Sequence, residues 1–193
     1  MSTSDSALLV IDVQNSFRDR PYWNDADALP FVAKIQTLID GAAARGVPVI
    51  QILHVEESGA FSIASGLVTT MSGISIDPTA VFHKGRHSAF VGSGLDVWLV
   101  RNGIRNVVVS GIRTEQCCET TARHASDLGY DVDYVTEATL TFPMVDRNGR
   151  LWSASDIRER TELVLEDRFA RIVTVDQALS RLSGEKRRVL QSA

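Results

Sequence analysis

The chain has 193 residues, of which 44% are hydrophobic and 23% are charged, with a formal net charge of −4. This length suits one domain with a full apolar core, so we expect a single domain over residues 1–193 that needs no disulfide or metal to fold. The charge balance lacks the basic footprint of a nucleic-acid-binding protein, and no run of about 20 apolar residues predicts a membrane span.

The start of the chain and its cysteines indicate a cytoplasmic protein. Residues 1–5 lack the charged n-region and hydrophobic stretch of a signal peptide, so we expect no processing. The two cysteines, Cys117 and Cys118, are adjacent, and this spacing suits neither a disulfide framework nor a zinc site. In a reducing compartment both are expected to be thiols.

Short apolar runs rich in β-branched residues recur along the chain and predict strands. In chain order they span residues 7–13, 47–53, 80–84 (the weakest), 106–110, 131–135 and 170–173. Their hydrophobicity is mostly continuous rather than alternating, which is typical of strands covered on both faces in a parallel sheet. Helical patterns lie between them, at residues 29–45, 95–102, 115–128 and 155–167.

The first three of these helices are followed by Gly46, Gly103 and Gly129, where a left-handed residue would end the helix. Alternating strands and helices predict a three-layer α/β sandwich around a parallel sheet. Residues 56–76, rich in Gly and Ser, are predicted as a loop with one helical turn, and the polar tail 183–193 is expected to fray. Ligands of such sheets bind beyond the carboxyl ends of the strands.

One thiol lies at the start of a helix at that edge. We expect Thr114 to cap this helix and Glu115 to occupy its first turn, where negative charge is favoured. Cys118 falls on the apolar face of this helix, and Cys117 lies about 100° around the helix axis from that face. The helix N-terminus could lower the pKa of Cys117 from about 8.5 to roughly 3.5–7.5, and its N–H groups could hold an oxyanion. The alternative is that Cys117 is also a small core residue.

A carboxylate ends the strongly apolar first strand. Burying the charge of Asp12 there costs free energy unless the carboxylate is paired or takes part in a functional site. Partial burial would raise its pKa and suit it to accept a thiol proton. Alternatively, Asp12 closes the turn before Phe17 as a capping residue. A phospho-accepting aspartate is a further alternative, but that chemistry needs an acidic cluster for magnesium, and none flanks Asp12.

A lysine ends the weakest predicted strand. Lys84 is followed by glycine and could project into the same cleft, where it would stabilise a thiolate or hold Asp12. The alternative is an ordinary solvated surface lysine.

Asp12, Lys84 and Cys117, in this order and each at the end of a strand, resemble the catalytic residues of the isochorismatase-like cysteine hydrolases. The resemblance covers residues 7–175, and its motifs are LVIDVQNSF at 9–17, KGRHSAF at 84–90, VSGIRTEQCC at 109–118 and TARHA at 121–125. This superfamily includes nicotinamidases, N-carbamoylsarcosine amidases and related carbamoyl and imide hydrolases. The resemblance implies a six-stranded parallel, Rossmann-like sheet flanked by helices, in a homodimer or homotetramer.

The resemblance also implies roles. Asp12 would be the base, Lys84 would support the charge separation, and Cys117 would attack a carbonyl to form a thioester. A non-proline cis peptide is implied at Ile112–Arg113, with the Arg113 and Cys117 N–H groups around the oxyanion. The nucleophile favours cleavage of a C–N bond in a small amide, carbamoyl or imide compound, without a cofactor. The acid-catalysed vinyl-ether cleavage of isochorismatases, which lack this cysteine, remains an alternative.

Nicotinamidases resemble this chain but carry an Asp-x-His-x-His-type metal site after the second strand, and the chain departs from them there. Here residues 52–57 read ILHVEE, and His54 with Glu56 gives only two possible ligands on one face. We therefore expect no metal, and nicotinamidase activity is disfavoured. The remaining histidines are interpreted as hydrogen-bonded scaffold or surface groups: His83, His87 and His124.

Candidate substrate-binding residues follow strand ends or the motifs. The aromatic candidates for the cleft wall are Phe17, Trp23 and Phe142, and the candidates for binding a substrate carboxylate are Arg86 and Arg113. Scaffold packing or a surface salt bridge remains an alternative for each. Two other functions stay open: a catalytically idle binding or scaffold protein, and a redox protein that uses the Cys117–Cys118 pair.

Overall fold

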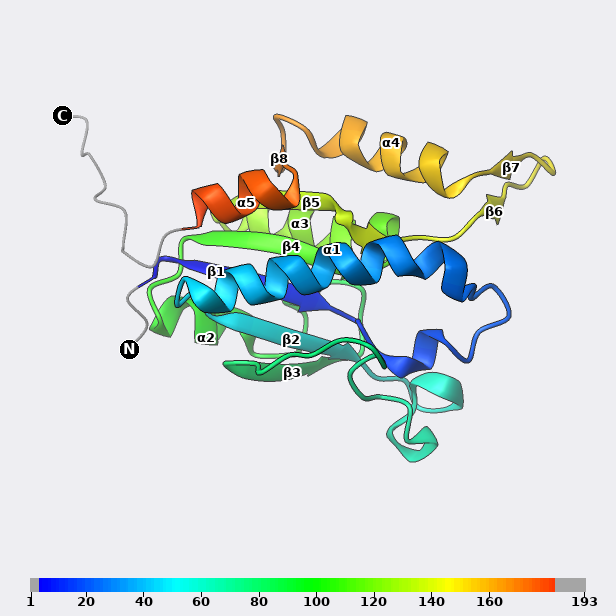
Figure 1. Cartoon of the computed structure of the whole chain (residues 1–193), viewed down its shortest axis with the longest axis horizontal. Helices are drawn as coiled ribbons and strands as arrows, with labels where there is room; N and C mark the ends of the chain where they lie inside the picture. The colour runs from blue at the N-terminus through cyan, green and yellow to red at the C-terminus, as the bar shows by residue number, and fades with distance from the viewer. Residues whose placement is uncertain (1–3, 183–193) are drawn as a thin grey trace.

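The apolar runs form a six-stranded sheet at the centre of the molecule (Figure 1). A computed structural model describes residues 4–182, so the tail expected at 183–193 lies outside the described residues. The strands, in spatial order, are β3 (Ala80–Lys84), β2 (Val49–His54), β1 (Ser6–Ile11), β4 (Asn106–Ile112), β5 (Asp131–Leu140) and β8 (Arg171–Ile172). Every neighbouring pair is parallel, which confirms the predicted parallel sheet.

Helices cover both faces of the sheet. The faces are divided between α1 (Asp25–Ala44) with α5 (Val175–Arg181), and α2 (Leu95–Arg101) with α3 (Glu119–Asp127) and α4 (Ala154–Leu165). The predicted three-layer sandwich is therefore confirmed. Helix α5 was not predicted, nor was the antiparallel hairpin of β6 (Met144–Val145) and β7 (Leu151–Trp152). Among residues 4–182, no helix is long and apolar enough to span a membrane.

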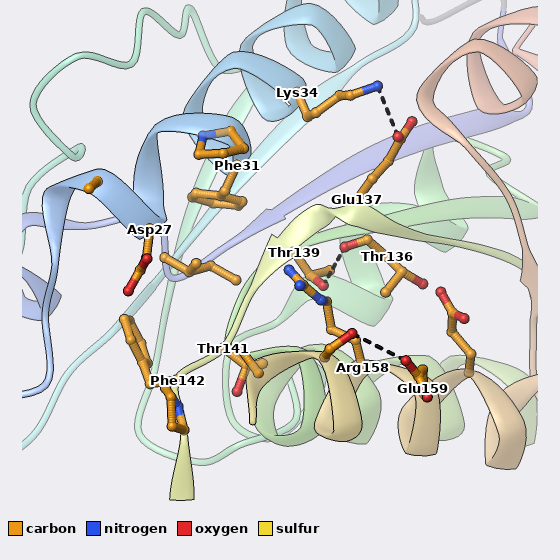
Figure 2. A pocket seen from close by; sticks show the side chains of 17 residues that line it. Asp27, Phe31, Lys34, Thr136, Glu137, Thr139, Thr141, Phe142, Arg158 and Glu159 are labelled. Carbon is orange, nitrogen blue, oxygen red and sulfur yellow. Dashed lines mark hydrogen bonds and ion pairs between the residues drawn. The ribbon is translucent and has the colours of Figure 1, made fainter. Parts of the chain in front are cut away.

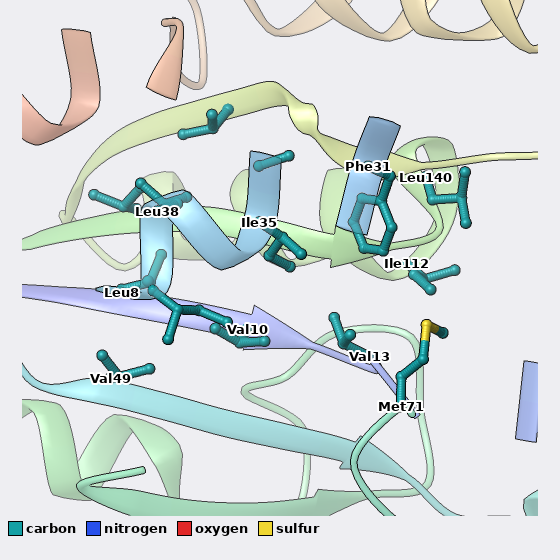
Figure 3. Close-up of a cluster of buried hydrophobic side chains, with 14 of the residues drawn as sticks. Leu8, Val10, Val13, Phe31, Ile35, Leu38, Val49, Met71, Ile112 and Leu140 are labelled. Carbon is teal, nitrogen blue, oxygen red and sulfur yellow. The ribbon is translucent and has the colours of Figure 1, made fainter. Parts of the chain in front are cut away.

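Strand β1 explains why the predicted strands are apolar throughout. Leu8 and Val10 point into the cluster beneath α1, where they meet Ile35 (Figure 3). Leu9 and Ile11 point the other way, into the cluster beneath α2 and α3. Because successive side chains of a strand alternate between its faces, a strand with helices on both sides must be apolar at every position.

The loops differ from the prediction in one segment. The glycines predicted to end helices, Gly46, Gly103 and Gly129, all have positive φ. The segment predicted as a loop with one turn holds two short 3₁₀ turns, η2 (Gly59–Phe61) and η3 (Ile63–Ser65). A further 3₁₀ turn, η1 (Asn15–Phe17), follows β1.

The chain order creates a crevice between β1 and β4. From β1 the chain runs outward to β2 and β3, then returns to pair β4 with the other side of β1. Connections on opposite faces diverge at such a reversal, which leaves space beyond the carboxyl ends of the two strands. The residues that follow β1 and β4 meet there, beside the end of β3.

Candidate active site

Asp12 is the first residue after β1, and it turns into the crevice. Its φ of +54° is left-handed, a conformation that aspartate tolerates better than most residues. The side chain is fully buried, and its Oδ2 accepts a hydrogen bond of 2.8 Å from Lys84 Nζ. Burial raises the pKa of Asp12, and the nearby Lys84 ammonium only partly opposes that effect. Its second oxygen, Oδ1, has no hydrogen-bond partner among the described residues.

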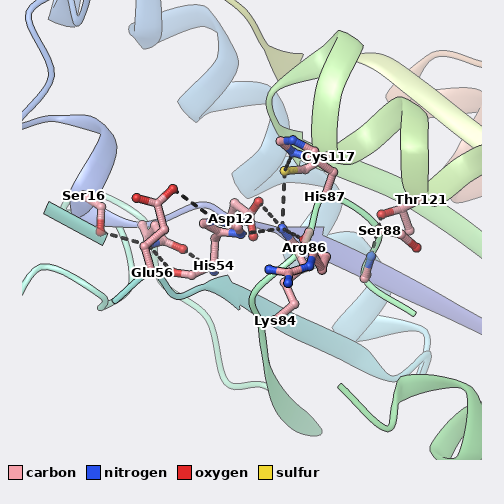
Figure 4. Close-up of polar contacts among 12 residues, drawn as sticks. Asp12, Ser16, His54, Glu56, Lys84, Arg86, His87, Ser88, Cys117 and Thr121 are labelled. Atoms are coloured by element: carbon pink, nitrogen blue, oxygen red, sulfur yellow. Dashed lines mark hydrogen bonds and ion pairs between the residues drawn. The ribbon is translucent and has the colours of Figure 1, made fainter. Parts of the chain in front are cut away.

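Lys84 is the last residue of β3 and is 2% exposed, so the alternative of a solvated surface lysine is wrong. Its ammonium lies within hydrogen-bond distance of four groups (Figure 4). These are Asp12 Oδ2 at 2.8 Å, the Arg86 carbonyl at 3.1 Å, His54 Nδ1 at 3.2 Å and Cys117 Sγ at 3.3 Å. Burial alone would lower the pKa of Lys84, but attraction to Asp12 and Cys117 outweighs it and raises the pKa. The lysine is therefore a fixed cation beneath the sulfur.

The end of β4 packs against β1 with no room for a side chain. Gly111 has a φ of +123°, and a Cβ there would lie 2.0 Å from the carbonyl oxygen of Ile11. The next peptide bond, Ile112–Arg113, is cis, as the resemblance implied. Only glycine allows the two backbones to approach this closely, so Gly111 brings the residues after β4 up to Asp12.

The segment that carries the thiol is a π-helical turn rather than a regular helix start. It is η4 (Thr114–Cys118), and α3 continues from it. The prediction that Thr114 caps this helix is wrong: Arg113 occupies the capping position, and the Thr114 hydroxyl is 2.7 Å from that of Thr139 on β5. Turns of π-helix are frequent at functional sites.

Cys117 is 7% exposed, and its sulfur faces the crevice, whereas Cys118 is fully buried on the apolar face as predicted. The expected lowering of the Cys117 pKa is wrong. Burial, followed by the negative charge of Asp12, raises the pKa of this thiol to about 12, although Lys84 opposes the shift. Desolvation thus outweighs the effect of the helix terminus, and the resting sulfur is a neutral thiol.

His54 is held in one tautomer. An ammonium has no acceptor, so His54 Nδ1 must accept from Lys84, and Nε2 carries the proton that points to Glu56 Oε1 at 3.4 Å. Burial and the Lys84 charge lower the pKa of this ring, which is therefore neutral. With both nitrogens engaged, His54 offers no lone pair to a metal, and residues 4–182 contain no group of three possible ligands. The residues present do not fit the metal site of nicotinamidases.

A cavity of about 230 Å³ opens above the sulfur. It is lined by Asp12, Phe17, Arg20, Tyr22, His54, Glu56, Phe61, His87, Arg113, Gln116 and Cys117. Of the predicted substrate-binding residues, the structure brings Phe17 and Arg113 to this lining. Trp23, Arg86 and Phe142 are not part of it.

These three residues make other contacts. The Trp23 indole N–H donates to Asp25 at 2.8 Å, and the Arg86 guanidinium donates to the carbonyl of Gly85 at 2.8 Å. Phe142 packs behind the cavity wall, with its ring centroid 4.6 Å from that of Tyr22. Arg86 does contribute to the site, but through its carbonyl oxygen, which accepts from Lys84.

Phe142 also lines a larger hollow, of about 740 Å³, between α1, the end of β5 and α4 (Figure 2). Lys34 of α1 and Glu137 of β5, which both line it, form an ion pair of 2.9 Å. Its lining contains none of Asp12, Lys84 and Cys117. The size of the hollow therefore does not make it the reactive site.

Several residues of the cavity were not predicted. Tyr22 is one of them, and its ring centroid lies 4.4 Å from the guanidinium of the predicted Arg113, which also pairs with Glu115 at 3.9 Å. Tyr22 had a signal, because it adjoins the predicted Trp23. His87 was interpreted as scaffold or surface, and it is exposed, but its Nδ1 also lies 3.7 Å from Cys117 Sγ.

Comparisons with known proteins show the family of this chain. Residues 6–177 match the isochorismatase domain family. The chain is 30% identical to Nicotinamidase 3 of Arabidopsis thaliana, over 93% of this chain and 89% of that one. It is 29% identical to the ureidoacrylate amidohydrolase RutB of Stutzerimonas stutzeri, over 72% and 71% of the two chains. The crystal structure of an isochorismatase-family protein from Burkholderia xenovorans LB400 superimposes with a TM-score of 0.83 at 30% identity, over 93% and 88%.

Proposed function

The chain belongs to the isochorismatase family of hydrolases, and we propose that it is a cysteine hydrolase that cleaves a C–N bond in a small amide, carbamoyl or imide compound. One observation carries this proposal. A single buried ammonium, Lys84 Nζ, lies 2.8 Å from the carboxylate of Asp12 and 3.3 Å from the sulfur of Cys117. A base, a cation and a nucleophile therefore share one crevice that opens into a cavity.

In the first half of the proposed reaction, Asp12 Oδ1 accepts the proton of Cys117 as the sulfur attacks the substrate carbonyl. The unpartnered state of Oδ1 and the raised pKa of Asp12 both favour this transfer. Lys84 stabilises the negative charge as it moves from the carboxylate to the sulfur. The backbone N–H groups of Arg113 and Cys117 are proposed to bind the developing oxyanion.

The first half ends when Asp12 returns its proton to the substrate nitrogen, and the C–N bond breaks as ammonia or an amine leaves. In the second half, water hydrolyses the acyl group that remains on Cys117 as a thioester, or the carbamoyl group that remains as a thiocarbamate. The thiol is restored, and no cofactor is consumed.

The volume of the cavity gives a scale for the part of the substrate that it can hold. Its 230 Å³ corresponds to the volume of about eight water molecules at ~30 Å³ each, which suits a substrate on the order of ten non-hydrogen atoms. The rings of Phe17, Tyr22 and Phe61 supply flat apolar walls for a planar amide or imide. Nicotinamidase activity is disfavoured in this proposal, because His54 and Glu56 do not offer the metal site that the resemblance implies for those enzymes.

Two single substitutions at adjacent cysteines test the proposal. Screening ammonia release from carboxamides, carbamoyl amino acids and cyclic imides should identify a substrate that wild type hydrolyses. Cys117→Ala should abolish turnover and leave the melting temperature nearly unchanged. Cys118→Ala is the control: it should keep activity but lose about 1 kcal/mol of stability, because it removes a fully buried group.

Each alternative function predicts a different result. Turnover by Cys117→Ala would exclude the thioester route, and activity on isochorismate in that variant would favour vinyl-ether cleavage. A wild type that binds compounds of the panel without hydrolysing them would indicate an idle binding protein. Iodoacetamide labelling followed by mass spectrometry separates the redox alternative, which requires an oxidised Cys117–Cys118 pair.

A further inference from the structure

The sulfur of Cys117 has a neighbour on the solvent side that the reaction above does not use. His87 is exposed, lines the cavity, and places its Nδ1 3.7 Å from Cys117 Sγ (Figure 4). Two imidazoles line this cavity. The other one is His54, and its two nitrogens contact Lys84 and Glu56. Within residues 4–182, the His87 side chain makes no hydrogen bond besides its contact with the sulfur. It is therefore the imidazole of the cavity that is free to exchange a proton.

The backbone that carries His87 is fixed on both sides. Before it, the carbonyl oxygen of Arg86 accepts a hydrogen bond of 3.1 Å from Lys84. After it, the N–H of Ala89 donates to the hydroxyl of Thr121 on α3 at 3.0 Å. A group held in place by its neighbours needs little reorganisation during a reaction. Although the His87 side chain is exposed, the backbone that carries it is therefore held by contacts of the site itself.

Asp12 and His87 approach the sulfur from different environments. Asp12 is fully buried, and Lys84 binds one of its oxygens, so it is suited to exchange a proton with the thiol and the departing nitrogen. The water that hydrolyses a thioester must instead arrive through the open cavity. An acyl group on the sulfur would lie in that cavity, beside the exposed imidazole. A base for this water has to be within hydrogen-bond reach of it.

We propose that His87 is a catalytic residue of the second half-reaction, the general base that activates water against the thioester. This inference rests on the proposed cysteine hydrolase function. The water oxygen bonds to the acyl carbon while its proton passes to the unprotonated nitrogen of His87. The tetrahedral intermediate then collapses, the C–S bond breaks with its electron pair going to sulfur, and His87 returns the proton to that sulfur. The products are the free acid and the neutral thiol.

An activated ester isolates this step from amine departure. The probe is p-nitrophenyl acetate, whose leaving group needs no proton, supplied in less than one equivalent to the full-length enzyme. Intact-mass spectrometry then follows both the appearance and the decay of acetyl-Cys117. The variants are His87→Asn and His87→Gln. His83→Asn is the control, because His83 is an exposed histidine near the end of β3 and does not line the cavity.

We expect acetylation at the wild-type rate in both His87 variants and decay of acetyl-Cys117 slower by about 10²-fold or more. His83→Asn should match wild type in both phases, and unchanged melting temperatures would show that all variants fold. Wild-type decay in the His87 variants would overturn the inference. Slower acetylation with decay at the wild-type rate would overturn it as well, because His87 would then act on the thiol. Acetylation that persists in Cys117→Ala, or that wild type does not show, would instead contradict the proposed function.

Discussion

A thiol next to a buried carboxylate keeps its proton, because a second negative charge in that space is unfavourable. At Cys117, burial and then Asp12 are the main causes of a pKa of about 12. The enzyme therefore does not store a thiolate. It forms one only as the proton moves to Asp12, which couples ionisation of the sulfur to its attack.

The first prediction concerns that coupling. Asp12→Asn should lower the pKa of Cys117, because the substitution removes the negative charge that opposes ionisation and leaves Lys84 in place. Hydrolysis should nevertheless fall by at least about 10²-fold, because the base is lost. The thiol pKa can be read from the pH dependence of iodoacetamide labelling at Cys117. A thiol pKa in Asp12→Asn equal to or above that of wild type would contradict this account.

The second prediction links the same thiol to stability. Its folded pKa of about 12 exceeds the ordinary value of 9.0, so the unfolded chain releases this proton first as the pH rises. The contribution of the neutral thiol to stability is complete below about pH 9 and is lost as the pH rises toward 12. Urea unfolding at a series of alkaline pH values should show a smaller loss of stability in Cys117→Ala than in wild type. Identical pH dependence in the two proteins would count against the raised pKa.

At the scale of elements, the contact between β1 and β4 leaves no space for a side chain at Gly111. Gly111 lies where a Cβ would approach the Ile11 carbonyl to 2.0 Å, and its φ is positive. Gly111→Ala should cost roughly 3 kcal/mol or more, because backbone strain and overpacking add. Gly66→Ala is the matched control, with positive φ but no atom within 4 Å of the added Cβ, and should cost about 1–2 kcal/mol. Equal unfolding midpoints in urea would show that the contact is not tight.

The elements also show how far the sequence predicts the fold. Apolar runs identified all six strands of the sheet, because burial on both faces leaves a clear pattern. Strand β5 continues past the predicted end to Leu140, through polar residues such as Thr136 and Thr139 that the pattern did not include. Helix α5 did have a signal, because Thr174 and Gln177 form a capping box. The π turn could not be predicted, because side-chain periodicity does not distinguish one widened turn from an α-helix.

At the scale of the molecule, the order of strands explains why part of the site was predictable. Asp12, Lys84 and Cys117 follow strand ends, and in a parallel sheet those ends lie at one edge. Their meeting could therefore be inferred, although their catalytic roles remain predictions. His87, Tyr22 and Phe61 lie on loops, whose paths depend on tertiary contacts that local sequence does not encode. The single domain over 1–193, the cytoplasmic location, and the absence of nucleic-acid and membrane partners also remain predictions.

The last prediction concerns assembly, which we propose to be a homodimer or homotetramer. Apolar side chains are exposed on the β6–β7 hairpin and on α4, at Val145, Leu151 and Leu163. If this surface is the interface, Leu151→Asp should reduce the mass measured by light scattering to that of a monomer. Val100→Asp, at an exposed position of α2, should leave the mass unchanged. A monomeric wild type would contradict the proposal.

The cavity walls and the reacting groups have separate supports, and this has a consequence for engineering. Phe17, Tyr22 and Phe61 come from the short turns after β1 and β2, whereas the reacting groups follow packed strands. Loop segments tolerate replacement far better than packed strands do. Phe17 and Phe61 themselves are buried in the core cluster, so libraries confined to the exposed positions within residues 17–23 and 56–63 should yield catalysts with new selectivity at little risk to folding.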